Sequence, residues 1–278
     1  MKTIVAHLSP DLDAISAAWL LKRFRPDWAE AELAFVPAGT TLDGQVVDSD
    51  PDIAHVDTGL GQFDHHQLKD RNQSATRRVF DWLVTQGHIN KYTITPLGRI
   101  VDFVTTIDSF GEAYFPDPTS DNYDFCLHQL ITGLNATNKN SQAVCETVFS
   151  LLDGALLVIA NKCRAEKELK HGFTFESHWG KSLAIESANE EAMKLALKMG
   201  YQLVIKRDPV SGHVRIKTFP APHLDLTPFY EILLKRDPKA TWFLHISTHM
   251  LLNGSAKNPL SVASALSIKQ IIAIATQI

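Results

Sequence analysis

The sequence of 278 residues is poor in the features that mark specialised classes of protein. It contains three cysteines, Cys126, Cys145 and Cys163, and no C-x-x-C pattern, so we expect neither a disulfide framework nor a zinc–thiolate cluster. A net charge of −4 provides no global basic field of the kind that binds long nucleic acids. Charged residues interrupt apolar runs such as 151–160 before they reach the length of a membrane span, and we find no repeat or low-complexity segment.

What remains is an ordinary globular composition, with 45% hydrophobic and 21% charged residues. The length suits one large domain or two modest ones. Met1-Lys2-Thr3 leads directly into an apolar strand pattern, which predicts that no signal peptide opens the chain. We therefore expect a soluble, cytoplasmic protein with no membrane partner. The oligomeric state is left open, and a homodimer is one of the options.

Strand and helix patterns alternate in the first part of the chain. Short apolar runs, several rich in β-branched residues, predict strands at 3–6, 33–36 and 53–56. Apolar residues at helical spacing predict helices over 14–24 and from 74 through 83. This alternation predicts an α/β fold with a mainly parallel sheet and flanking helices.

The rest of the chain divides into a helical part and a second α/β part. Residues 95–171 carry apolar stripes at helical spacing. Alternation then resumes, with strands predicted at 183–185, 201–205, 214–219 and 242–246 and helices at 190–199, 227–235 and 260–278. We expect an N-terminal domain over 1–120, a helical connector over 121–172 and a smaller α/β domain over 173–278.

Acidic and imidazole side chains gather in three short blocks of the N-terminal domain. The blocks are H-L-S-P-D-L-D, with His7, Asp11 and Asp13; H-V-D-T-G, with Asp57; and the consecutive Asp64-His65-His66. Carboxylates and neutral imidazoles together suit divalent cations such as Mn, Fe, Co or Zn. Two such cations, about 3.5–4 Å apart, are the usual apparatus for in-line displacement at phosphorus. The blocks therefore predict a two-metal site.

The predicted sheet supports this interpretation, although each block has a plainer alternative. His7 and Asp57 come just past strand ends, where open α/β sheets hold their ligands. Taken alone, Asp13 could cap the following helix, and Asp57 could belong to ordinary turn chemistry. On a strand, His65 and His66 would point to opposite sides, so only one of them would bind a metal directly.

In order and spacing, the blocks resemble the DHH phosphoesterase superfamily. Its motifs run H-x-x-x-D-x-D, then a strand-terminal Asp, then D-H-H, then a later Asp on a helix. Asp108 matches the last motif, with Asp102 as the competing candidate; we prefer Asp108 because an apolar stripe precedes it. Ser74-Ala75-Thr76 is also similar to the small-residue helix start that follows D-H-H in this superfamily. The match covers about the first 110 residues.

The resemblance implies a ligand set. It assigns one metal to His7, Asp11 and Asp57, and the other to Asp13, Asp57, His65 and Asp108, with Asp57 shared. It implies that His66 faces the phosphate and that Asp64 orients a histidine. Manganese is the common metal of the superfamily, and Mg, Co, Fe and Zn stay open. The implied chemistry is hydrolysis by a water that two metals activate.

The C-terminal segment W-F-L-H-I-S-T-H-M-L-L-N-G-S-A-K-N-P is the candidate for substrate binding. A strand followed by small polar residues and a lysine can present N–H groups and a cation to a phosphate. The substrate-binding candidates are His245, His249, Asn253, Gly254, Ser255 and Lys257. A β-hairpin with an Asn-Gly turn explains the same letters equally well, and His245 could be a core histidine.

Within the superfamily, F-D-H-H-Q over 63–67 and this segment are most similar to the melanocyte-proliferating-gene exonuclease family. The first block instead looks like RecJ-type enzymes and family II pyrophosphatases, and the paired glycines of the exonuclease tail are missing. We expect a metal-dependent phosphoesterase that cleaves RNA, short oligonucleotides or nucleotides. The alternatives are a pyrophosphatase or small-molecule phosphatase, and a metal-bound protein that binds a ligand without turnover.

Overall fold

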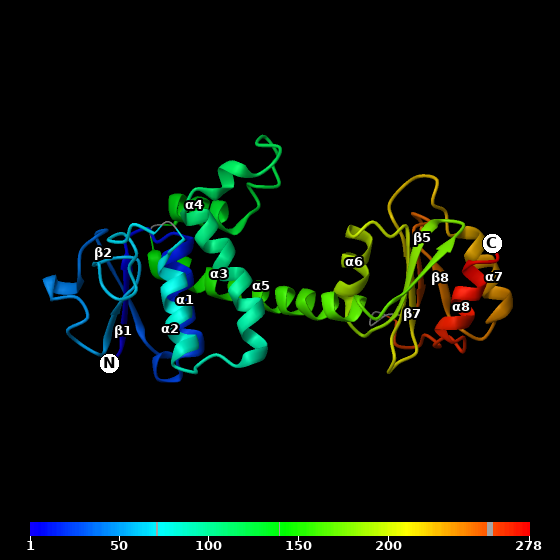
Figure 1. Cartoon of the computed structure of the whole chain (residues 1–278), viewed down its shortest axis with the longest axis horizontal. Helices are drawn as coiled ribbons and strands as arrows, with labels where there is room; N and C mark the ends of the chain where they lie inside the picture. Colours follow the sequence, from blue (N-terminus) through cyan, green and yellow to red (C-terminus); the bar gives the residue numbers. More distant parts are fainter. Residues whose placement is uncertain (71, 139, 255–257) are drawn as a thin grey trace. The chain divides into compact units, whose positions relative to one another are not determined.

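The computed structural model describes residues 1–70, 72–138, 140–254 and 258–278. They form two compact units, Met1–Ala160 and Asn161–Ile278, and each is described by itself (Figure 1). The predicted division into a catalytic domain, a connector and a substrate-binding domain concerns roles and stays a prediction.

The first unit is a small parallel sheet packed against helices. Its elements are β1 (Thr3–His7), α1 (Leu12–Phe24), η1 (Pro26–Trp28), β2 (Glu32–Val36), η2 (Leu42–Gly44), β3 (Ile53–His55), α2 (Ala75–Thr85), α3 (Lys91–Asp108), η3 (Gly111–Tyr114), α4 (Leu127–Thr137) and the beginning of α5 (Ser141–Leu169), where η denotes a short 3₁₀ helix. The strands run parallel in the order β2-β1-β3. The predicted α/β class with a parallel sheet is therefore confirmed.

Helix α1 forms the centre of this unit. Every residue from Leu12 to Leu21 is buried, because small residues such as Ala14 and Ala17 let neighbouring elements approach closely. The side chain of Asp11 caps the helix by accepting hydrogen bonds from the backbone N–H groups of Asp13 and Ala14. The cap is thus Asp11, whereas the sequence had left Asp13 as a candidate for that role.

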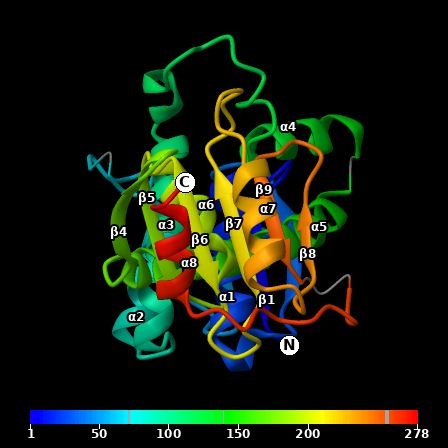
Figure 2. The same ribbon diagram turned by 90° about the vertical axis from the view of Figure 1, so that its right-hand side faces the viewer.

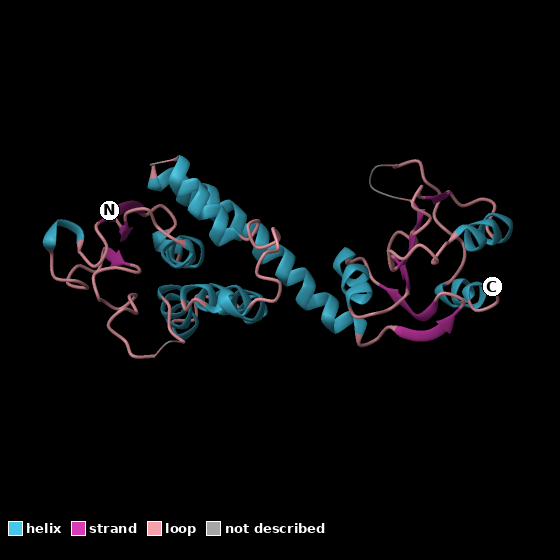
Figure 3. Cartoon of the chain, turned by 90° about the horizontal axis from the view of Figure 1, so that it is seen from above, coloured by secondary structure: helices cyan, strands magenta, loops and turns pink. Residues whose placement is uncertain are grey.

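Helix α5 crosses the boundary between the two units as one continuous helix (Figure 3). Among the described residues it is the one helix whose length and composition would allow it to cross a membrane. The sequence analysis judged the run 151–160, which lies in this helix, too short for a membrane span because charges interrupt it, whereas the whole helix passes the test of length and composition. Its residues Val144, Val148 and Leu152 are buried in the core of the first unit.

The second unit is a six-stranded mixed sheet with helices on both faces. Its elements after α5 are β4 (Phe173–Ser177), β5 (Gly180–Glu186), α6 (Glu190–Lys198), β6 (Leu203–Arg207), β7 (Val214–Thr218), α7 (Thr227–Arg236), β8 (Trp242–Leu244), β9 (Met250–Asn253) and α8 (Ile268–Ala275). The strand order is β4-β5-β6-β7-β9-β8, and β5–β6 is its parallel pair. Helices α7 and α8 cover one face and α6 covers part of the other (Figures 1 and 2).

Three predictions for the second unit were wrong in detail. Strands β4 and β9 were not predicted, because β4 is a largely exposed edge strand and β9 had been interpreted as part of a loop. The last helix begins at Ile268 rather than at 260. Ser267 starts it with a capping box to Gln270, and the chain before it is held by hydrogen bonds such as that from the Ser264 N–H to the Asn253 side chain.

Candidate metal centre

The three sequence blocks converge at the carboxyl ends of β1 and β3. His7 is the last residue of β1, and Asp57 follows β3 by two residues. Because the two strands are parallel neighbours, both side chains lie at the same edge of the sheet. Asp11 and Asp13 stand at the start of α1, directly after His7. The short spacing of the first block therefore brings a strand end and a helix start to one place.

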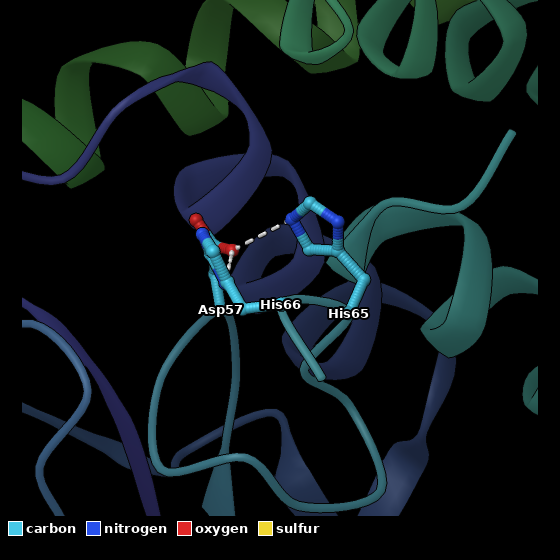
Figure 4. A group of neighbouring side chains, drawn as sticks. All are labelled: Asp57, His65 and His66. Atoms are coloured by element: carbon cyan, nitrogen blue, oxygen red, sulfur yellow. Dashed lines mark ion pairs between the residues drawn. The ribbon is translucent and has the colours of Figure 1, made fainter. Parts of the chain in front are cut away.

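Asp57 is the hub of the cluster. Its Oδ2 lies 3.4 Å from His7 Nε2, and its Oδ1 lies 3.3 Å from His65 Nε2 and 3.7 Å from His66 Nδ1 (Figure 4). Its backbone is left-handed, with φ 55°, a conformation that Asp tolerates better than bulkier residues. The Asp57 N–H donates to the carbonyl of Phe63, and this bond holds the third block beside the strand end. One side of the hub thus faces the first block and the other faces the third.

A second group forms around His65. Its Nε2 lies 3.7 Å from Asp13 Oδ2 and 3.5 Å from Asp108 Oδ2. Asp108 is the last residue of α3, whereas the competing Asp102 is exposed on the same helix and pairs with Arg77. The structure therefore brings Asp108, and not Asp102, to the cluster.

Three sets of side chains are close enough to hold a metal ion. Within each set, one ligand atom per residue lies within 4.8 Å of the others; the sets are His7, Asp11 and Asp57; Asp13, His65 and Asp108; and Asp57, His65 and His66. The first two sets correspond to the two ligand groups that the resemblance implied, with Asp57 between them.

The sequence analysis considered His65 and His66 as strand residues, but in the structure they do not lie on a strand. They belong to the loop that leads to α2, and their ring centroids are 4.4 Å apart. Asp64 is buried and fixes this loop: one carboxylate oxygen accepts the His66 N–H at 3.0 Å and lies 2.8 Å from His66 Nδ1. The other oxygen accepts the Leu60 N–H at 2.7 Å. His66 is thereby oriented while 60% of its side chain stays exposed.

The start of α2 holds Asp13. The backbone N–H groups of Ala75 and Thr76 donate to its two carboxylate oxygens at 2.6 and 2.8 Å, and the Thr76 hydroxyl donates to its backbone carbonyl at 2.9 Å. A helix N-terminus stabilises negative charge through these free N–H groups. The sequence showed Ser74-Ala75-Thr76 as a helix start but not its partner, which lies 62 residues earlier.

The carboxylates of the cluster repel one another in a buried setting. Burial, with the charges of Asp57 and Asp108 adding to it, raises the pKa of Asp13 to about 7. Burial also raises the pKa of Asp108 to about 6, although the neighbouring His65 opposes the shift. Ionisation of Asp13 and Asp108 therefore costs more free energy than ionisation of an exposed carboxyl group, and a bound cation would offset this cost.

The pKa values of the two imidazoles next to Asp57 are raised as well, which favours their charged form. The contact with Asp57 raises the pKa of His65 to about 9, against the effect of burial. Burial lowers the pKa of His7, but Asp57 and the other nearby acceptors outweigh it and raise the value to about 9. Burial works against the charged form of Asp57, yet His65 and His7 lower its pKa below the usual range. The carboxylates around Asp57 therefore favour positive charge at His7 and His65.

The donor atoms also pass a direct test of fit to a metal. Asp57 Oδ1 and His65 Nε2 are buried and lie 3.3 Å apart as an ion pair, but neither makes a well-aligned hydrogen bond to a residue that the structure describes. Buried polar atoms are seldom left unsatisfied, so a pair of them at the centre of a donor cluster points to a missing ligand. Oxygen and imidazole nitrogen donors suit Mn, Fe, Co or Zn, and carboxylates also suit Mg.

A cavity of about 740 Å³ opens beside the cluster. Asp11, Asp13, His65, His66 and Asp108 lie on its wall. The opposite wall comes from the end of α3, from η3 and from α4, and sequence reasoning identified none of its polar and aromatic residues, which include Phe110, Glu112, His128 and Asn135. The Asn135 side chain donates to the Pro10 carbonyl at 2.9 Å and thereby ties α4 to the loop of the first block.

The substrate-binding candidates of the second unit do not form one group. His245 and His249 lie in the turn between β8 and β9, where His245 Nδ1 is 2.9 Å from the Ser247 hydroxyl and His249 Nδ1 is 2.9 Å from the Leu224 carbonyl. Asn253 and Gly254 lie at the other end of β9. Strands β8 and β9 form a hairpin whose turn precedes Met250, so this is a different hairpin from the one with an Asn-Gly turn that the sequence analysis gave as an alternative.

Asn253 is fully buried and its side chain is engaged within the chain. Its Nδ2 donates to the carbonyls of Thr241 and Val262 at 3.1 and 2.9 Å, and its Oδ1 accepts the Ser264 N–H at 2.7 Å. Gly254 has φ 84°, and a Cβ there would lie 2.1 Å from His213 Nδ1, so close packing explains the glycine. The remaining two candidates, Ser255 and Lys257, lie outside the described residues.

Comparisons with known proteins give limited guidance. No family model and no curated protein matches the sequence. Similar solved structures include RecJ in complex with Mg2+ from Thermus thermophilus (11% identity, TM-score 0.29), an exonuclease RecJ bound to manganese (10%, 0.30) and a DHH domain described as a member of the s1p family of ribosomal proteins (10%, 0.32). Each match covers 99% of this chain. It covers 49% of the Thermus RecJ, 89% of the manganese-bound exonuclease and 86% of the DHH-domain protein. This chain therefore spans about half the length of the Thermus RecJ. At these TM-scores the functional assignment rests on the residues of the site.

Proposed function

We propose that this protein is a hydrolase that uses two divalent metal ions, with manganese as the first candidate, to cleave phosphodiester bonds in RNA, short oligonucleotides or nucleotides. The observation that carries the proposal is the position of Asp57. Its two carboxylate oxygens face different donor groups, one through His7 and the other through His65. A shared carboxylate between two His/Asp groups is the arrangement that holds a pair of metals for displacement at phosphorus.

The assignment of ligands follows the two groups. His7, Asp11 and Asp57 would hold one ion, and Asp13, His65 and Asp108, together with Asp57, would hold the other. The four carboxylates bring four negative charges, which two divalent cations neutralise. This balance would relieve the repulsion that raises the pKa values of Asp13 and Asp108.

The chain's own residues would orient the reaction. When bound, the metal ions would supply an activated water and would neutralise charge on the phosphoryl oxygens. His66 lines the cavity and would donate a hydrogen bond to the phosphate or a proton to the leaving oxygen. Asp64 would act on His66 by holding Nδ1, so that Nε2 is directed away from the carboxylate. Asn135 and the start of α2 would keep the loop of the first block in place.

Product analysis of the manganese-loaded protein tests this proposal. The substrates would be a short RNA, a short DNA, a cyclic dinucleotide and pyrophosphate. Asp108→Asn is the test variant and Asp102→Asn is its matched control, since both residues lie on α3 but only Asp108 reaches the cluster. We expect mononucleotide products from the wild type and from Asp102→Asn, and a loss of turnover in Asp108→Asn.

Other outcomes identify other classes. Phosphate release from pyrophosphate alone would make the protein a pyrophosphatase. Metal binding without turnover on any substrate would indicate a ligand-binding protein. Equal activity of Asp108→Asn and the wild type would contradict the assignment of the second metal group.

A further inference from the structure

The cavity wall opposite the donor cluster carries an exposed aromatic ring in an unusual conformation. Phe110 is 79% exposed and has φ 59°, in the left-handed region that bulky residues rarely occupy. It follows Asp108 by two residues and lines the same cavity. Strained backbone of this kind tends to be kept where a side chain must be held in a particular place.

The neighbouring backbone explains how this conformation is maintained. The Phe110 N–H donates to the Ile107 carbonyl at 2.9 Å. Gly111 lies so close to α3 that a Cβ would be 2.4 Å from the Thr106 side chain and 2.7 Å from its carbonyl oxygen. The chain must therefore turn sharply at the end of α3, and this turn places the Phe110 ring at the cavity instead of in the core.

Two polar atoms on the same wall lack partners. Glu112 Oε2 and His128 Nδ1 are buried and have no hydrogen-bond partner within the described residues. Both side chains line the cavity. Glu112 lies on η3 and His128 on α4, so two separate elements each bring a residue with an unsatisfied atom to the lining of one cavity. Such atoms are expected where a ligand supplies the missing bonds.

The rest of this wall is apolar. Val104, Ile107 and Ile131 line the same cavity as the aromatic ring and the two polar residues. An exposed ring, an apolar floor and a few hydrogen-bonding atoms are the features that bind a nucleobase, which is flat, stacks on aromatic rings and carries donors on its edge. Inorganic pyrophosphate would use none of them.

We propose that this wall is a nucleobase subsite. Phe110 stacks on the base of the nucleotide whose phosphate lies at the donor cluster, and Glu112 accepts a hydrogen bond from the exocyclic amino group of that base. A carboxylate acceptor favours adenine, cytosine and guanine over uracil, which has no amino group. His128 contributes a bond to the same base edge. The location of the phosphate rests on the proposed function, whereas the recognition of the base does not.

Equilibrium binding tests the subsite without requiring turnover. The ligands are AMP, CMP, GMP, UMP and ribose 5-phosphate, added to the manganese-loaded full chain. The test variants are Phe110→Ala and Glu112→Gln, with Phe110→Tyr as the conservative variant. Phe125→Ala is the matched control, because Phe125 is equally exposed at 80% but does not line the cavity.

The expected pattern separates stacking from phosphate binding. Phe110→Ala should weaken AMP binding about tenfold and leave ribose 5-phosphate unchanged, whereas Phe110→Tyr and Phe125→Ala should bind AMP like the wild type. The wild type should prefer AMP to UMP, and Glu112→Gln should reduce this preference. An equal loss for AMP and ribose 5-phosphate in Phe110→Ala, or no loss for either, would overturn the subsite.

A turnover assay separates this proposal from the proposed function. The substrates are a dinucleotide and its abasic analogue, which share the phosphodiester bond. Phe110→Ala should slow only the dinucleotide. If no substrate is cleaved but nucleotides bind in a Phe110-dependent manner, the subsite stands and the hydrolase assignment fails. If both substrates are cleaved and Phe110→Ala affects them equally, the hydrolase stands and the subsite fails. No binding and no cleavage would refute both.

Discussion

Each compact unit of this protein buries polar side chains that the sequence analysis selected, and Asn253 of the second unit differs from Asp57 and His65 of the first in how its hydrogen bonds are completed. In the second unit, Asn253 is completely buried, and its amide makes three hydrogen bonds to the surrounding chain. In the first unit, Asp57 Oδ1 and His65 Nε2 are buried and lie 3.3 Å apart, and neither makes a well-aligned hydrogen bond among the described residues. Polar groups that complete their bonds within the chain stabilise a fold, whereas groups that do not complete them indicate a ligand.

Buried charged residues also differ between the core of the second unit and the donor cluster of the first. Lys206 of the second unit is 3% exposed, and its Nζ donates to Glu190 at 2.8 Å and to the Ser187 carbonyl at 3.3 Å. Opposite charges are paired there. At the first unit's cluster, four carboxylates share two paired imidazoles, and burial together with the charges of Asp57 and Asp108 raises the pKa of Asp13. The first unit holds the arrangement of a binding site, and the interior of the second unit holds that of a structural core.

The largest expected effect is the loss of activity in Asp57→Asn. The shared carboxylate would be replaced by an amide that cannot neutralise either metal ion, so we expect kcat/KM to fall by at least about a thousandfold. Steady-state kinetics on the best substrate of the panel measures this, and circular dichroism checks that the variant folds. Turnover near the wild-type rate would show that Asp57 is not the hub and would remove the main contrast between the units.

The converse variant, Asn253→Ala, should cost stability and spare activity. It removes three hydrogen bonds and leaves the Thr241 carbonyl and the Ser264 N–H without these partners, while the Val262 carbonyl still accepts the Thr241 N–H, so we expect a loss of about 3 kcal/mol in the free energy of unfolding. Chemical denaturation measures this loss, with the exposed Asn122→Ala as a control that should change stability by less than about 0.5 kcal/mol. A drop in kcat/KM at unchanged stability would instead make Asn253 a substrate ligand, as the sequence suggested.

The sequence predicted the first unit better than the second for a physical reason. The elements that bring His7, Asp11, Asp13 and Asp57 together are two parallel strand ends and the start of the helix that follows one of them. Parallel strands place their carboxyl ends at one edge, so strand patterns alone predict that these residues meet. Asp108 could be proposed because a motif and an apolar stripe agree on it.

The contacts that the sequence did not reveal depend on distant segments. The hydrogen bonds from the start of α2 to Asp13 join residues 62 and 63 positions apart. The position of Phe110 depends on how tightly Gly111 approaches α3, which no local pattern encodes. In the second unit, the letters N-G suggested a turn, but the turn between β8 and β9 formed earlier, because Asn253 is taken up by the core.

Metal binding should stabilise the protein through the site of the first unit, and this stabilisation should not depend on the core of the second unit. At a free manganese concentration of 100 times Kd, we expect the free energy of unfolding to rise by about 2.7 kcal/mol relative to the protein in EDTA. Thermal denaturation with and without metal measures the change. Asp57→Asn should lose the increment, and Asn253→Ala should keep it from a lower baseline. An increment that survives in Asp57→Asn would place the bound metal elsewhere.

The smallest expected effect concerns the residue that orients His66. Asp64→Asn removes the carboxylate oxygens that hold the His66 ring and the Leu60 N–H, so we expect kcat to fall about 10- to 100-fold. Loss of fold would give a similar drop, so a double-mutant cycle with His66→Gln is needed. If Asp64 acts through His66, the double variant should be no slower than His66→Gln alone, whereas independent effects would multiply. If the losses in kcat multiply, Asp64 is a structural residue of the loop. The backbone, and not the Asp64 carboxylate, would then determine the position of His66.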